Sequence, residues 1–154
     1  MAMFQLLIDS PIGPLTLSGT ETALTKLTFG DVRQAGNCSA SVLEQAAREL
    51  SEYFSGTRRE FTVPLAPEGS DFQQKVWAAL RSVPYGTTAS YKDIAVQTGK
   101  PGAAVAVGQA NSKNPIPIII PCHRIIGTNG KLTGYTGGLH IKKALLQLEG
   151  IAAE

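Results

Sequence analysis

A thiol, an imidazole and a guanidinium follow one another at Cys122, His123 and Arg124, inside the apolar run IIIPCHRII at 118–126. A cysteine thiolate is a soft nucleophile, a histidine can take up a proton near neutral pH, and an arginine is a permanent cation. Burying three such groups in sequence costs free energy unless each has a partner. The segment therefore predicts either an inert buried cysteine or a nucleophile with its base nearby, and both interpretations remain open here.

Two features of the segment favour the nucleophile. Pro121 suits a chain that enters a helical turn, which would place the Cys122 sulfur near a helix N-terminus, where the thiolate is stabilised. Adjacent side chains on a turn point about 100° apart, so His123 would reach the thiol through a water molecule. Glu149, at the end of a predicted helix over 140–150, is the candidate carboxylate for orienting the imidazole. The alternative for Glu149 is an exposed terminal carboxylate.

The composition is that of an ordinary globular chain with few soft ligands. Of 154 residues, 43% are apolar and 17% are charged, and no apolar run approaches the ~18 residues that span a bilayer. The N-terminus lacks the features of a secretory signal, so we expect a cytoplasmic protein with no membrane segment. Cys38, Cys122, His123 and His140 show no metal-ligand spacing, so we expect neither a metal nor a cofactor.

Charge and turn formers divide the chain into two predicted domains, 1–66 and 67–154. Residues 1–69 hold five Lys or Arg and eight Asp or Glu, whereas residues 70–154 hold nine and four. The sign changes at APEG, over 66–69. A basic second half is compatible with a polyanionic partner, and a chance imbalance is the alternative.

The first half is predicted to be α/β. Short runs rich in Leu, Thr, Ile and Phe, broken by Gly and Pro, predict strands at 3–9, 14–19, 23–30 and 60–65. Helical periodicity predicts a helix between them, with a capping box at Ser41 and Glu44 and an end at Gly56.

The second half is predicted to be helical. Capping boxes at Ser70 with Gln73, and at Ser90 with Asp93, open two helices, and a third over 103–114 consists mostly of small residues. The last two, joined by a short turn, have the outline of a helix-turn-helix. The small residues permit close approach by another surface, and tight packing inside the core is the alternative.

Several motifs in a fixed order resemble the O6-alkylguanine-DNA alkyltransferases. PCHR stands in an Ile-rich frame, GYTGGL follows it, and the last helix ends in LQLEG. The likeness extends to VPYGTTASYKDIA and GAAVAVGQANSKNP and covers about residues 70–150, while the first half matches only in layout. The resemblance implies a ribonuclease-H-like α/β domain, with a small antiparallel sheet plus a helix, followed by a mostly α, winged-helix-like helix-turn-helix domain.

The resemblance also implies the activity. An alkyl group would move from O6-alkylguanine, or O4-alkylthymine, to Cys122, after the nucleotide has been flipped out of duplex DNA bound through its minor groove. A relay would run from Cys122 through water to His123 and Glu149, and Tyr91 would donate to guanine N3. The thioether product has no route to cleavage, so one monomer would repair one lesion.

Further residues would form the pocket and the DNA-binding surface. Asn114 would brace the turn before the cysteine, and Arg124 would hold the active-site segment in place. The pocket would be completed by the carbonyls of Cys122 and Ile125 and by Tyr135, Thr136 and Gly137. The DNA-binding surface would comprise Ala103, Ala104, Val105, Gly108, Lys92 and Lys113.

One position departs from the family pattern. Members carry A-A-R-A-V-G in the second helix of the helix-turn-helix, and the arginine fills the gap left by the flipped base. This chain has AAVAVG, with Val105 in its place. Valine can wedge apolar bulk between bases but lacks the charge and reach of arginine. We expect slower repair of duplex DNA than in an arginine-bearing relative, unless Lys113 or Lys92 compensates.

Two other protein classes remain open. A cysteine hydrolase also uses Cys and His, but it brings them together from separate segments, whereas here they are adjacent. A lesion-binding protein related to the alkyltransferases, with weak or no transfer, would keep the helix-turn-helix. The presence of Cys122 argues against this class, and Val105 argues for it.

Overall fold

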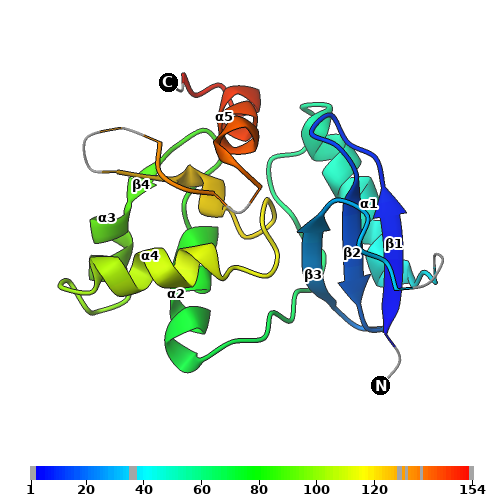
Figure 1. Ribbon diagram of the computed structural model, residues 1–154, viewed down its shortest axis with the longest axis horizontal. Helices are drawn as coiled ribbons and strands as arrows, with labels where there is room; N and C mark the ends of the chain where they lie inside the picture. Colours follow the sequence, from blue (N-terminus) through cyan, green and yellow to red (C-terminus); the bar gives the residue numbers. More distant parts are fainter. Residues whose placement is uncertain (1–2, 35–37, 128–129, 131, 136, 153–154) are drawn as a thin grey trace. The chain divides into compact units, whose positions relative to one another are not determined.

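The computed structural model describes residues 3–34, 38–127, 130, 132–135 and 137–152, and Figure 1 shows the chain as a ribbon. The chain divides into two compact units, Met1–Glu68 and Gly69–Glu154. Each unit has its own buried core.

The first unit is a three-stranded antiparallel sheet with one helix. The strands β1 (Phe4–Ile8), β2 (Leu15–Gly19) and β3 (Leu24–Phe29) pair in the order β1-β2-β3, and α1 spans Ser41–Phe54. Every residue of the central strand β2 is buried, because it has a neighbour on both edges and α1 against one face. The helix contributes its apolar side to this core through Val42, Leu43, Ala46, Leu50 and Tyr53. The predicted α/β arrangement is confirmed.

Two local predictions for the first unit are wrong. Residues 60–65 form no strand and contribute a single bridge between Leu24 and Leu65. The reason is that the backbone N–H groups of Thr62 and Val63 donate to the buried Glu49 carboxylate, at 2.9 and 3.1 Å, instead of to a neighbouring strand. The start of α1 has no side-chain cap, because the extended cap residue is Ala40 and the serine after it already belongs to the helix.

The second unit is built mainly of helices. It contains α2 (Asp71–Arg81), α3 (Tyr91–Gln97), α4 (Ala104–Ser112) and α5 (Leu139–Leu148), with a 3₁₀ turn, η1, at Cys122–Arg124. The two-residue strands β4 (Ala89–Ser90) and β5 (Ile125–Ile126) pair in parallel. Helices α2, α3 and α4 pack on one another.

The predicted capping boxes of α2 and α3 are both confirmed. In each, the cap serine accepts from the backbone of the third helical residue, whose side chain accepts from the cap amide in return. Gly99 then closes α3 at φ +85°, a left-handed conformation that glycine adopts without strain. The next helix, α4, begins a few residues later, so α3 and α4 form the expected helix-turn-helix.

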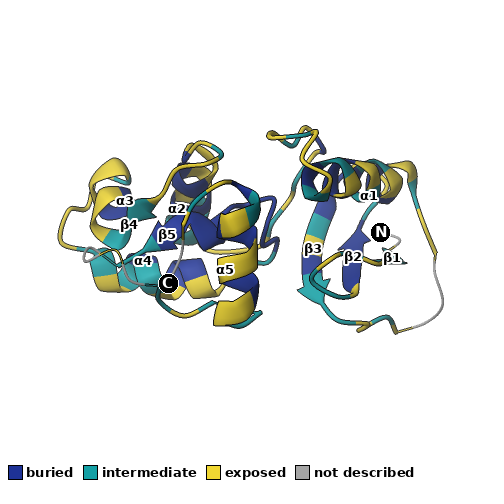
Figure 2. Cartoon of the chain, turned by 90° about the horizontal axis from the view of Figure 1, so that it is seen from above, coloured by how far each residue is buried: buried dark blue, intermediate teal, exposed yellow. Residues whose placement is uncertain are grey.

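Helix α4 has a buried side and an exposed side. Val107, Ala110 and Asn111 are buried, and the Trp77 indole donates to the Ala110 carbonyl at 3.0 Å. On the other side Val105 is 78% exposed, and Figure 2 shows α4 with buried and exposed segments. Tight packing in the core therefore describes one side of α4. The other side is exposed and remains open to close approach by another surface.

Within the described residues, none of the helices has the length and apolar character that crossing a membrane requires.

Candidate functional site

The segment between α4 and β5 is held by its own backbone and by one amide side chain. Asn114 donates to the carbonyl of Ile120 at 2.8 Å and accepts from the N–H of Ile116 at 2.9 Å. Ile118 has φ +76°, a left-handed conformation that is unfavourable for a β-branched residue. Strain of this kind persists where the surroundings fix it, and here Ile118, Ile119 and Ile120 are all buried. The apolar run therefore presents Cys122 on a rigid backbone.

A buried carboxylate links the two residues after the cysteine. One oxygen of Glu149 lies 2.7 Å from His123 Nε2 and 3.1 Å from Arg124 Nη2, while the other accepts from Arg124 Nε at 2.8 Å. That second oxygen also accepts from the Gly86 N–H at 3.1 Å, and Arg124 Nη1 donates to the Val83 carbonyl at 2.7 Å. The side chains of His123 and Glu149 are fully buried, so the alternative of an exposed terminal Glu149 was wrong.

The surroundings of His123 determine the protonation of its imidazole. Burial lowers the pKa of its imidazole, and the neighbouring Glu149 opposes that shift. A neutral imidazole that donates from Nε2 to the Glu149 carboxylate has its lone pair on Nδ1. Nδ1 is buried and has no hydrogen-bond partner among the described residues. The imidazole is therefore available as a proton acceptor on the side away from Glu149.

Cys122 is buried with 2% of its surface exposed. Burial raises the pKa of its thiol to about 11, against the opposing effects of an Asn114 hydrogen bond, the Lys142 charge and a Tyr135 hydrogen bond. The expectation that the turn would favour the thiolate is therefore wrong for the unliganded protein. The 3₁₀ turn contains only three residues, and its effect on the sulfur is smaller than the cost of desolvating a thiolate.

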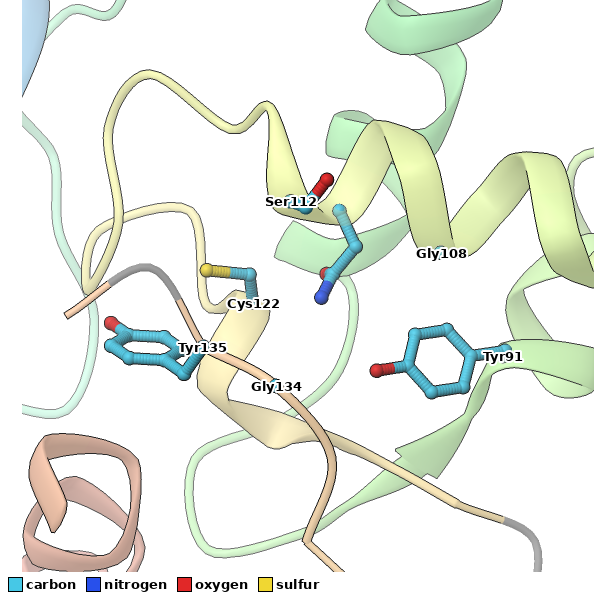
Figure 3. Close-up of a pocket in the computed structure, with 7 residues that line it drawn as sticks. Tyr91, Gly108, Ser112, Cys122, Gly134 and Tyr135 are labelled. Atoms are coloured by element: carbon cyan, nitrogen blue, oxygen red, sulfur yellow. The ribbon is translucent and has the colours of Figure 1, made fainter. Parts of the chain in front are cut away.

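A cavity of about 360 Å³ opens beside the cysteine. Tyr91 reaches it from the start of α3 and Tyr135 from the loop before α5, as Figure 3 shows. A Cβ on Gly108 would lie 3.7 Å from the Tyr91 ring, so α4 passes close behind that ring. The lining residues are Tyr91, Gly108, Asn111, Ser112, Cys122, Gly134 and Tyr135. The cavity thus brings together a nucleophile, two phenols and a small-residue helix.

The sequence prediction missed Lys142, whose side chain is fully buried. Its ammonium donates to the Ile125 carbonyl at 2.5 Å and lies 3.3 Å from the Thr133 carbonyl. Burial lowers the pKa of Lys142 to about 8. A signal was present, because Lys142 lies three residues before Leu145 and so on the apolar side of α5.

The other predicted residues lie as follows. Lys92, Lys113 and Val105 are exposed, and Ala103, Ala104, Gly108 and Gly137 are partly exposed. Thr136 lies outside the described residues. The carbonyl of Cys122 accepts from the Ile125 N–H, and the carbonyl of Ile125 accepts from Lys142.

Two family models match the chain in consecutive segments. The model described as 6-O-methylguanine DNA methyltransferase, ribonuclease-like domain, matches residues 3–67. The model described as 6-O-methylguanine DNA methyltransferase, DNA binding domain, matches residues 71–151.

The similarity to known proteins and solved structures covers nearly the whole chain. The methylated-DNA–protein-cysteine methyltransferase of Methanosarcina barkeri is 52% identical over 153 residues, which are 96% of this chain and 97% of that protein. The protein of the same name from Mycobacterium bovis is 53% identical over 147 residues, or 92% and 89% of the two chains. The crystal structure of the Mycobacterium tuberculosis O6-methylguanine methyltransferase has a TM-score of 0.87 at 50% identity and covers 96% of this chain and 93% of that one.

A second Mycobacterium tuberculosis structure, of OGT in complex with DNA, has a TM-score of 0.86 at 51% identity and covers 96% and 93% of the two chains. These likenesses span both units and include the segment that carries Cys122. The chain belongs to the 6-O-methylguanine DNA methyltransferase family.

Proposed function

We propose that this chain repairs DNA by moving the alkyl group of O6-alkylguanine onto Cys122. The observation that carries the proposal is the buried Cys122 thiol beside a cavity, next to a His123–Glu149 pair whose free imidazole nitrogen can accept a proton. The names of the relatives, methylated-DNA–protein-cysteine methyltransferase, support the same reaction class.

The reaction is an in-line displacement at the alkyl carbon. The Cys122 thiol loses its proton, through a water molecule, to Nδ1 of His123, and the resulting imidazolium is stabilised by Glu149. A bond then forms between sulfur and the alkyl carbon while the bond between that carbon and O6 breaks, and its electron pair passes to the guanine. The guanine takes up at N1 the proton that the thiol released, returned by the His123 imidazolium through water, so its ordinary structure is restored and the imidazole is neutral again.

The high pKa of the thiol fits this sequence of events. A thiolate inside an apolar segment would be costly to keep before the substrate arrives, and the resting protein holds the neutral form instead. Proton removal is then coupled to occupation of the pocket, when the base displaces solvent from the cavity, the water between Cys122 and His123 remains, and the electrophilic carbon lies next to the sulfur.

The pocket offers donors and acceptors for the base. Tyr91 would donate to guanine N3 as negative charge grows on the leaving base. The second lone pairs of the Cys122 and Ile125 carbonyls would accept from the exocyclic amine, and the loop that carries Tyr135 would bound the alkyl group. O4-alkylthymine presents the same alkoxy carbon on a smaller ring, so it is a second substrate under this proposal.

The target carbon lies within the stacked duplex, so the nucleotide must leave the stack to reach Cys122. We assign DNA binding to the exposed side of α4 together with Lys92 and Lys113, through the minor groove. Small side chains there permit close approach, and Val105, 78% exposed, would insert between bases. One monomer carries one complete pocket.

The direct test is incubation of the protein with a duplex that contains O6-methylguanine. Mass spectrometry of the digested protein is expected to show one added methyl group on the Cys122 peptide and a plateau at one methyl per chain. Repeated turnover, or a methyl group on another residue, would contradict the mechanism. Tight binding to the lesion without any adduct would instead support the lesion-binding alternative.

Replacing Val105 with arginine is expected to speed repair of duplex DNA by about tenfold and to leave repair of a single-stranded substrate unchanged, because holding a base out of a duplex costs a few kcal/mol. Rates of methyl transfer to both substrates measure the effect. Val96→Arg adds the same charge at an exposed site on the neighbouring helix α3 and serves as the matched control. Equal gains from both variants would attribute the effect to charge alone.

A further inference from the structure

We propose that Thr133 is a positioning residue, whose hydroxyl accepts a hydrogen bond from Lys142 and donates one to Tyr91, so that the Tyr91 proton remains available for the leaving base. This inference rests on the proposed function, because it concerns the same pocket. It adds two residues that neither the sequence motifs nor the comparisons assign.

The contacts form a continuous chain across the pocket. Tyr91 Oη and Thr133 Oγ1 lie 2.5 Å apart, and Lys142 Nζ lies 3.4 Å from the same Thr133 oxygen. The ammonium also contacts the Ile125 carbonyl at 2.5 Å and the Thr133 carbonyl at 3.3 Å. These hydrogen bonds therefore connect α3, the loop before α5, α5 itself and the Ile125 backbone that follows η1.

The chemistry of Lys142 fixes the direction of the hydrogen bonds at one end of this series. An ammonium group has three protons and no lone pair, so Lys142 can only donate, and its three protons match the three oxygens around it. Thr133 Oγ1 is then an acceptor toward Lys142. Either hydroxyl can donate in the contact with Tyr91, and in the arrangement that we propose the Thr133 proton is directed at Tyr91 Oη. Tyr91 accepts that proton, so its own O–H is directed elsewhere.

The free direction of the Tyr91 O–H is the pocket. Tyr91 lines the cavity together with Cys122, and its hydroxyl is the polar atom of α3 that reaches it. A donor whose oxygen already accepts from a hydroxyl next to a cation is a stronger donor than an isolated phenol, because successive hydrogen bonds polarise one another. Without Thr133 the phenol keeps its proton but loses both the fixed orientation and the polarisation.

Lys142 supplies the charge at the other end of the chain. Its pKa of about 8 keeps it a cation at neutral pH in spite of its burial. Lys142 also links the loop before α5 to the backbone after η1, because its ammonium donates both to the Thr133 carbonyl and to the Ile125 carbonyl. Lys142 therefore holds Thr133 in place, and Thr133 acts through Tyr91.

The test is a double-mutant cycle on the rate of Cys122 methylation by an O6-methylguanine duplex. Thr133→Val, of nearly the same shape but without the hydroxyl, is expected to slow transfer by about tenfold in the wild-type background. In the Tyr91→Phe background the same change is expected to slow transfer by less than about twofold, because its partner is already absent. Thr133→Ser keeps the hydroxyl and is expected to remain within about threefold of the wild-type rate.

A second measurement uses the free protein and needs no reaction. The short bond between Tyr91 and Thr133 is expected to give a downfield hydroxyl-proton NMR resonance that is present in the wild type and in Thr133→Ser and absent from Thr133→Val and Tyr91→Phe. A wild-type protein that shows this resonance but forms no adduct would contradict the proposed function and leave the contact established.

Two results would overturn the inference itself while the proposed function stands. The first is equal slowing by Thr133→Val in both backgrounds, which would mean that Thr133 does not act through Tyr91. The second is a Thr133→Val protein that transfers at the wild-type rate or retains the resonance.

Discussion

Replacing Cys122 with alanine is expected to abolish alkyl transfer and to leave a folded protein that still binds damaged DNA. The nucleophile is removed outright, so the rate should fall by more than about 10⁴-fold. The fold should persist, since truncating one small buried side chain costs on the order of 1 kcal/mol. Methyl counting by mass spectrometry and a gel-shift assay with an O6-methylguanine duplex measure the two properties.

The chain contains its own control for this prediction. Cys38 is exposed and does not line the cavity, so Cys38→Ala is expected to transfer at the wild-type rate. Because the Cys122→Ala protein cannot complete the reaction, its complex with the lesion should last longer than that of the wild type. Transfer that continued in Cys122→Ala and stopped in Cys38→Ala would overturn the assignment of the acceptor.

Replacing Glu149 with glutamine is expected to lower the free energy of unfolding by about 3–5 kcal/mol, because it leaves the buried Arg124 without its counter-charge. The same change removes the charge that stabilises a protonated His123, so the transfer rate should fall by about 10²-fold. Urea denaturation and single-turnover methylation measure the two effects.

An exposed ion pair of similar length provides the matched control. Arg58 and Glu52 lie 2.7 Å apart, with side chains 28% and 40% exposed. Glu52→Gln is expected to change the free energy of unfolding far less than Glu149→Gln does, because water solvates the Arg58 guanidinium that is left unpaired. Equal destabilisation by the two variants would show that burial of the Glu149 cluster adds nothing to its strength.

The helices were predictable because their signals are local. The capping boxes at Ser70 and Ser90 and the glycine after α3 lie within a few residues of the ends that they define, and all three function as expected. The false strand at 60–65 shows the limit of this approach. A short run rich in strand-forming residues suggested pairing, but the backbone N–H groups of Thr62 and Val63 donate to Glu49, thirteen and fourteen positions earlier in the chain.

The site was predictable in its residues and not in its electrostatics. Cys122 and His123 were visible as an adjacent pair, but the burial of Glu149 depends on Gly86 and Arg124, which approach it from distant segments. The raised pKa of the thiol depends on how deeply the apolar run is packed, which no local pattern contains. Residues that are usually solvated, such as Lys142, are found in a core only after their partners have been placed.

The parallel pairing of β4 with β5 has a consequence for which changes of sequence the site can survive. Ser90, the cap of α3, pairs with Ile126, so the backbone that begins the helix-turn-helix is bonded to the backbone that follows the nucleophile. The separation between the helix-turn-helix and the sulfur thus depends on chain length and register as well as on side chains such as Asn114. Point substitutions on the exposed side of α4 leave this pairing in place, whereas a single inserted residue between α2 and Ser90 would have to be absorbed before the pairing or would shift the register.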